Sequence, residues 1–186
     1  MYTNEFYREG FTRAKSTLAS LVDHLDDIQF STRPNPDAWC VGEVISHLLK
    51  SGEEYLAVME PKLEGGLDRY PKVSGEYKHA WHLRLFIKSV SPEFRRRIKT
   101  LPSFEPVQIE ELEKTALLSD FNALQDRFLT LIEIAEEHQI DLSKVKLNNP
   151  IYPIIKMNLS SCFAIMEAHQ RRHFQQIERT ILLVIR

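Results

Sequence analysis

Residues 168–177 read AHQRRHFQQI and place two histidines, His169 and His173, four positions apart in a long run with helical periodicity. In an α-helix, residues i and i+4 lie one turn apart on the same face, so both imidazoles point the same way. Two imidazoles arranged like this can bind one metal ion. Met166 and Ile177 continue the same stripe. We therefore expect this face to be buried, with both histidines directed inward.

A metal site on these two histidines needs a third ligand, and we choose His47. This residue lies in a second helical segment, residues 40–60, which should stop before Pro61. Val44 and Tyr55 share its stripe, which places His47 on or beside the core face. The competing interpretation is that the three histidines are hydrogen-bonded core residues that hold no metal.

Four segments have the three- and four-residue apolar periodicity of long amphipathic helices: residues 4–26, 40–60, 120–138 and 159–185. Residues 61–119 form an insertion between the second and third of these helices, with shorter helices expected at 80–90 and 92–99. Residues 141–153 read as a loop, and no stretch alternates with period two for long enough to predict a sheet. The sequence thus predicts one all-α domain over residues 1–186, a four-helix bundle with a long helical crossover insertion.

Composition narrows the class of protein further. The 186 residues are 27% charged and 43% apolar, with a formal net charge of −2, so we expect neither nucleic acid nor an anionic membrane as a partner. Cys40 and Cys162 are too few for a disulfide scaffold and favour a reducing, cytoplasmic setting. The N-terminus has no signal-peptide pattern, and no run of 18 apolar residues predicts a membrane span.

Two motifs and a loop resemble the DinB-like superfamily, in matching order and spacing across nearly the whole chain. Residues 37–48 (DAWCVGEVISHL) have a tryptophan before a capping residue and then a helix that carries one histidine. Residues 167–177 contain the His-x3-His pair of the final helix. The loop at 146–150 (KLNNP), followed by 158–160 (NLS), also fits. The main departure is Cys40, where serine or threonine is commoner.

The resemblance implies a four-helix bundle, frequent homodimers, and a divalent metal on His47, His169 and His173. Three neutral imidazoles leave a coordination position open, as in catalytic sites, and both zinc and nickel suit imidazole ligands. Some relatives transfer small thiols or are thiol-dependent isomerases. We therefore expect a metal-dependent transferase of thiols, or a hydrolase, that acts on a small molecule. The alternative is a catalytically silent bundle in which the histidines or the metal are structural.

The remaining histidines are weaker candidates for site residues. His79 and His82 are three residues apart beside Trp81, and we expect surface roles for them. His24 lies beside the first helix's core stripe, and His138 ends its helix, where an imidazolium suits the helix dipole.

Outer partners should orient the three imidazole rings through their second nitrogens. Five residues are candidates by helical position: Glu43, Glu54, Tyr55, Glu167 and Gln176. Arg171 and Arg172 flank the inner stripe of the last helix, where they can pair with carboxylates or reach an anionic substrate. Serine-protease, phosphate-loop and dinucleotide-binding motifs are all missing from the sequence.

Overall fold

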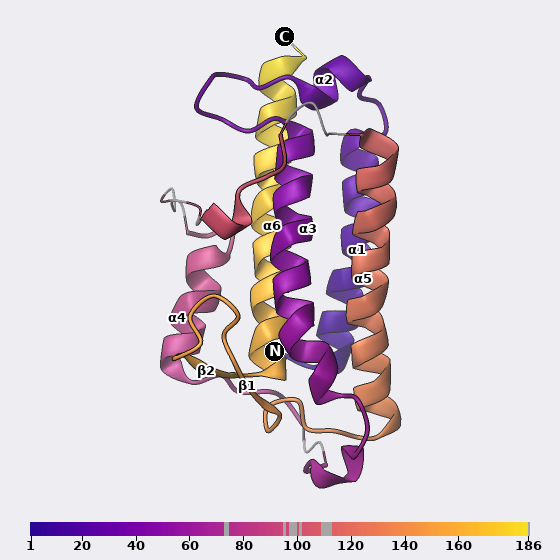
Figure 1. Ribbon diagram of the computed structural model, residues 1–186, viewed down its shortest axis with the longest axis vertical. Helices are drawn as coiled ribbons and strands as arrows, with labels where there is room; N and C mark the ends of the chain where they lie inside the picture. Colours follow the sequence, from indigo (N-terminus) through magenta and orange to yellow (C-terminus); the bar gives the residue numbers. More distant parts are fainter. Residues whose placement is uncertain (73–74, 95, 97–99, 101, 109–112, 186) are drawn as a thin grey trace.

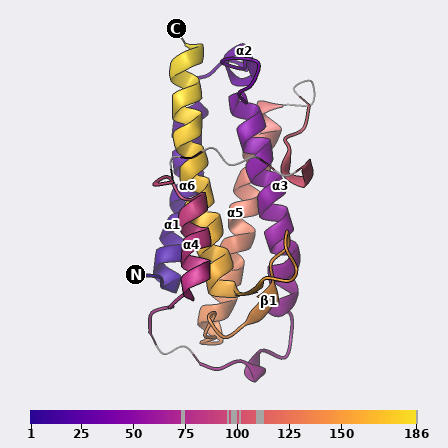
Figure 2. The same cartoon turned by 90° about the vertical axis from the view of Figure 1, so that its left-hand side faces the viewer.

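The computed structural model describes the chain over residues 1–72, 75–94, 96, 100, 102–108 and 113–185. Four long helices run along its length: α1 (Asn4–Val22), α3 (Val41–Met59), α5 (Lys114–Glu137) and α6 (Leu159–Val184). α1 and α3 each pack against both α5 and α6, so the four helices enclose the core between them (Figure 1 and Figure 2). The predicted all-α four-helix fold is confirmed.

Shorter elements cover the ends and one side of these four helices (Figure 1). They are the helices α2 (Asp27–Ser31) and α4 (Trp81–Val90) and the 3-10 turns η1 (Glu60–Lys62), η2 (Leu67–Arg69) and η3 (Pro102–Phe104). α4 packs along α6. None of the helices in the described ranges combines the length and the apolar character needed to cross a membrane.

Two helix ends differ from the sequence prediction because of side-chain caps. α5 begins at Lys114 rather than 120, since the Glu113 carboxylate accepts hydrogen bonds from backbone N–H groups of the first turn. The first long helix ends before residue 26, where Asp26 and Gln29 form a reciprocal capping box that starts α2. In both places the cap decides where the helix begins.

The insertion and the following loop contain one expected element and one unexpected element. α4 matches the helix predicted at 80–90. Of the helix predicted at 92–99, residues 92–94 form a turn, while 95 and 97–99 lie outside the described residues. The loop expected at 141–153 instead contributes β1 (Lys146–Asn148) to an antiparallel pair with β2 (Lys156–Asn158). Strands of three residues are too short to give a recognisable alternation.

The core lies where the helical periodicity predicts it. Apolar spacing in the four long helices predicts eight deeply buried residues, and all eight are at most 4% exposed: Phe11, Leu18, Val44, Leu48, Phe128, Leu131, Phe163 and Met166. Phe11 of α1 stacks on Phe128 of α5 with ring centroids 4.7 Å apart. Gly52 of α3 faces the Leu124 side chain of α5, and a Cβ at this position would lie 2.4 Å from the nearer Leu124 methyl group. A larger residue at position 52 would therefore force the buried Leu124 side chain to shift.

An unusual cap fixes the start of α3. The backbone N–H of Glu43 donates to the Cys40 thiol at 3.4 Å, and the Cys40 N–H donates to the Glu43 carboxylate at 2.9 Å. Burial raises the pKa of Cys40 to about 11, so the thiol stays neutral. Arg33 adds a two-pronged ion pair to the buried Glu43 carboxylate. Glu43 and Arg33 thus support a cap that a thiol alone would make weak.

Candidate metal centre

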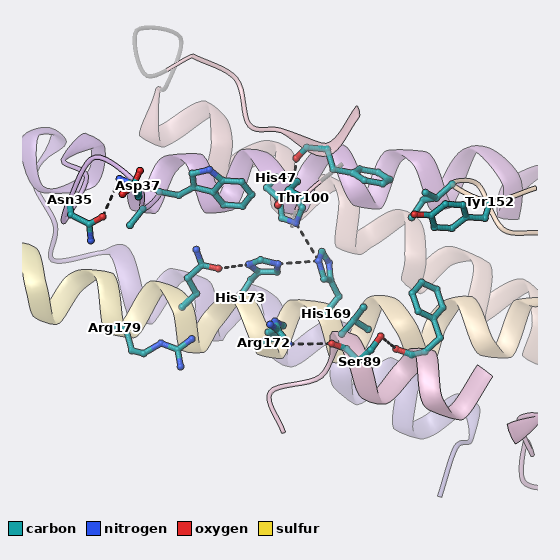
Figure 3. A pocket seen from close by; sticks show the side chains of 17 residues that line it. Asn35, Asp37, His47, Ser89, Thr100, Tyr152, His169, Arg172, His173 and Arg179 are labelled. Atoms are coloured by element: carbon teal, nitrogen blue, oxygen red, sulfur yellow. Dashed lines mark hydrogen bonds between the residues drawn. The ribbon is translucent and has the colours of Figure 1, made fainter. Parts of the chain in front are cut away.

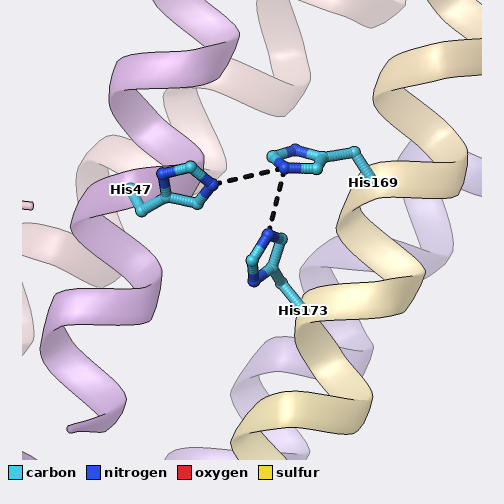
Figure 4. Close-up of side chains that lie close together, drawn as sticks. All are labelled: His47, His169 and His173. Atoms are coloured by element: carbon cyan, nitrogen blue, oxygen red, sulfur yellow. Dashed lines mark hydrogen bonds between the residues drawn. The ribbon is translucent and has the colours of Figure 1, made fainter. Parts of the chain in front are cut away.

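Three histidine side chains from two neighbouring helices converge between α3 and α6 (Figure 4). Nε2 of His169 lies 3.3 Å from Nε2 of His47 and 3.0 Å from Nε2 of His173. Two ligands about 2.1 Å from a tetrahedral zinc ion stand about 3.4 Å apart, so this spacing suits one shared ion. Within the described ranges, no other histidine, cysteine or carboxylate joins this cluster.

The outer nitrogens of two rings fix where the lone pairs point. Nδ1 of His47 lies 2.7 Å from the carbonyl oxygen of Phe104, and Nδ1 of His173 lies 2.9 Å from Oε1 of Gln176. Both oxygens can only accept, so both Nδ1 atoms carry the proton and both Nε2 atoms present a lone pair to the centre. His169 can offer at most one N–H to these two lone pairs. A cation satisfies all three nitrogens together, so the residues present fit a metal ion.

Burial keeps the three imidazoles neutral. It lowers the pKa of His173 to about 3 and also lowers the pKa of His47. The pKa of His169 falls well below its ordinary value, first through burial and then through the neighbouring His173 and His47. Neutral imidazole is the form that binds a metal, so no proton has to be displaced at neutral pH.

The cluster lines a cavity of about 650 Å³ (Figure 3). Aromatic side chains form much of its wall, including Trp39, Phe86, Phe104 and Tyr152. The Trp39 ring lies 5.0 Å from the His47 ring, centroid to centroid. The open side of the histidine cluster therefore faces a space large enough for a small molecule.

Comparison with known families agrees with the motifs. The model of the DinB superfamily matches residues 11–177, a range that includes His47, His169 and His173. The chain belongs to the DinB superfamily. No curated protein and no solved structure matches it.

One of the five outer partners predicted for the histidines of this DinB superfamily protein does contact the site. Gln176 accepts from His173, whereas Glu43 caps α3 and Tyr55 lies beside Asn149. Glu167 pairs with Arg171 and Glu54 is exposed. The partner of His47 was missed, because it is the backbone carbonyl of Phe104, 57 positions away. A backbone carbonyl has no signature in the sequence, and only the path of η3 along α3 brings it to the ring.

The two arginines beside the histidine pair have structural partners. Arg171 pairs with Glu167 at 2.7 Å and with Glu93 at 3.7 Å. Arg172 donates to four backbone carbonyls in and just after the last turn of α4: those of Ser89, Ser91, Phe94 and Arg96. Arg172 lines the cavity, but its guanidinium is occupied in holding the end of α4 against α6.

Among the other histidines, His79 is the one that is buried. It is 8% exposed and its Nε2 atom lies 3.5 Å from the hydroxyl of Tyr7. Its Nδ1 atom has no hydrogen-bond partner among the described residues. His24 and His82 are exposed. None of the three joins the cluster. The surface role expected for His79 is wrong, because its ring is packed against Tyr2 and lies beside Tyr7.

Because the His79 ring is buried, we expect the protein to lose stability in mild acid. Burial lowers the pKa of His79 to about 4, so below pH 6.5 the unfolded chain takes up a proton that the native protein does not. The contribution of neutral His79 to the free energy of unfolding is therefore fully present above pH 6.5. It is lost as the pH falls toward 4, by up to about 1.4 kcal/mol per pH unit. Urea unfolding between pH 4 and 7 should show a shallower pH slope for His79→Gln. The exposed His24→Gln should keep the wild-type slope, and an unchanged slope in His79→Gln would contradict the assignment.

Proposed function

We propose that this DinB superfamily protein binds one divalent ion, zinc or nickel, through His47, His169 and His173, and uses it on a small molecule in the cavity. The observation that supports this is the fixed direction of the lone pairs. The Phe104 carbonyl and the Gln176 amide turn two Nε2 lone pairs toward the same point as His169. Without a metal, His169 can donate one N–H to only one of the two lone pairs. The other lone pair would then have no donor among the three rings.

The ligand set favours catalysis over a purely structural role. Structural zinc sites are usually closed by four protein ligands, whereas here three imidazoles face a cavity and no fourth candidate lies near among the described residues. Neutral imidazoles add no negative charge, so they leave the positive charge of the ion undiminished. An ion held there would lower the pKa of a thiol or a water molecule that enters the cavity. We therefore propose transfer of a small thiol or hydrolysis as the reaction.

A chelation experiment separates an enzyme from a silent bundle. Untagged protein is stripped with a chelator, and helicity is followed by circular dichroism while two reactions are assayed. These are transfer of cysteine thiol to a chloronitrobenzene and hydrolysis of a nitrophenyl ester. We expect stripped protein to keep its helices and to lose an activity that zinc or nickel restores. If metal raises the melting temperature but neither reaction responds to it, the silent bundle is the better account.

Gln176→Leu should weaken metal binding without removing a ligand. The variant loses the acceptor that orients His173, and loss of such an outer partner typically costs about 10- to 100-fold in affinity. Competition with a chromophoric chelator measures this change. The neighbouring exposed Gln175→Leu is the matched control and should bind like the wild type. Equal affinities for the two variants would mean that the Gln176 contact does not support the site.

A further inference from the structure

The cavity has polar and charged side chains at one end. Figure 3 shows Asn35, Asp37 and Arg179 at that end, Tyr152 at the other, and the three histidines between them. A molecule that extends from the histidines toward the C-terminal part of α6 therefore meets an amide, a carboxylate and a guanidinium.

The two arginines that line the cavity differ in whether their guanidinium groups already have hydrogen-bond partners. Arg172 donates to four backbone carbonyls and is committed to them. Arg179 is exposed and has no hydrogen-bond or ion-pair partner among the described residues. Asp37, at the same end, already takes part in another interaction. The guanidinium of Arg179 can therefore form an ion pair with a bound molecule.

Helix geometry sets how far apart these residues lie along α6. Arg179 follows His173 by six residues, a rise of about 9 Å along the helix axis at 1.5 Å per residue. Gln176 stands between them, and all three residues line the cavity. A molecule whose carboxylate pairs with Arg179 while its other end lies at the histidines must therefore extend along α6.

We propose that Arg179 is a specificity-determining residue that selects elongated small molecules with a terminal carboxylate, whose middle or far end lies at the three histidines. A guanidinium pairs with a carboxylate through charge-assisted hydrogen bonds. The planar fork of one guanidinium matches the two oxygens of one carboxylate. The proposal rests on the proposed function, because it takes the histidine cluster as the reacting centre.

Paired probes of equal length test this selection. Cobalt-loaded protein is titrated with 6-mercaptohexanoate and with 6-mercapto-1-hexanol, and sulfur binding to cobalt is followed by absorption. The carboxylate should bind on the order of tenfold more tightly than the alcohol, as expected for a charge-assisted contact. Mercaptoacetate should show no such advantage over 2-mercaptoethanol, since it is too short to reach Arg179. Equal advantages for the long and the short acid would indicate general charge attraction and would overturn the proposal.

Variants assign the effect to one side chain. Arg179→Gln should remove the advantage of the carboxylate and leave the affinity for the alcohol unchanged, and Arg179→Lys should restore part of it. Arg84→Gln removes one exposed charge from α4 outside the cavity and should behave like the wild type. A carboxylate preference that survives in Arg179→Gln would contradict the assignment.

The same probes distinguish a failure of the carboxylate proposal from a failure of the metal proposal. If the protein takes up no cobalt, the proposed metal function fails. The preference for 6-mercaptohexanoate is then measured on metal-free protein by calorimetry, where its contact with Arg179 needs no ion. An advantage lost in Arg179→Gln would support the carboxylate site without the metal, and no advantage would reject it.

Discussion

Replacing His169 with alanine is expected to lower the zinc affinity of the protein by a factor on the order of 10³ or more, because only two of three ligands remain. His169 is the most informative residue to replace, since its Nε2 atom lies next to the Nε2 atoms of both other histidines. His47→Ala and His173→Ala should have similar effects. Competition titration against a chromophoric chelator measures the affinities, and circular dichroism checks that each variant is folded.

His79→Gln is the matched control for this experiment. His79 is as buried as His173, at 8% exposed, but it lies beside Tyr7 rather than in the cluster. Its replacement should change the zinc affinity less than twofold, although it can change stability. If His79→Gln weakened zinc binding as strongly as His169→Ala, the effect would come from general loss of packing, and the assignment of ligands would be wrong.

Phe128→Ala should have the largest effect on folding, at about 3–5 kcal/mol of unfolding free energy. The side chain is fully buried and stacks on Phe11, and it meets Phe163 edge-on at 6.2 Å between centroids. Its truncation leaves a cavity where α1, α5 and α6 meet. Urea unfolding of metal-free protein measures the loss. Leu182→Ala, at a residue that is 66% exposed, should stay within about 0.5 kcal/mol. Similar losses in both variants would mean that Phe128 is not at the centre of the core.

Much of the fold could be predicted because helical burial repeats every three or four residues. That repeat places Phe11, Val44, Phe128 and Met166 on the inner faces of their helices, and all four are buried. Helix ends do not follow from this repeat, since they depend on single side chains such as the Glu113 cap of α5. The short β1–β2 pair carries too few residues for any periodicity.

The candidate site was predictable only in part, for a related reason. The spacing of His169 and His173 fixes their common face, and the motif around His47 supplied the third histidine, so the structure brings together the three that the sequence named. The Phe104 carbonyl and the place of Arg179 in the cavity depend on how distant segments pack. The homodimer also stays a prediction, which light scattering can check.

Metal analysis of untagged protein, purified without chelators, tests the central claim most directly. X-ray absorption at the metal edge then identifies the ligands in the same sample. The account predicts one divalent ion per chain, coordinated by three imidazole nitrogens and no sulfur, and no bound ion in His169→Ala. A protein that binds no ion even when zinc or nickel is supplied, or whose ion is coordinated by a cysteine thiolate, would contradict it.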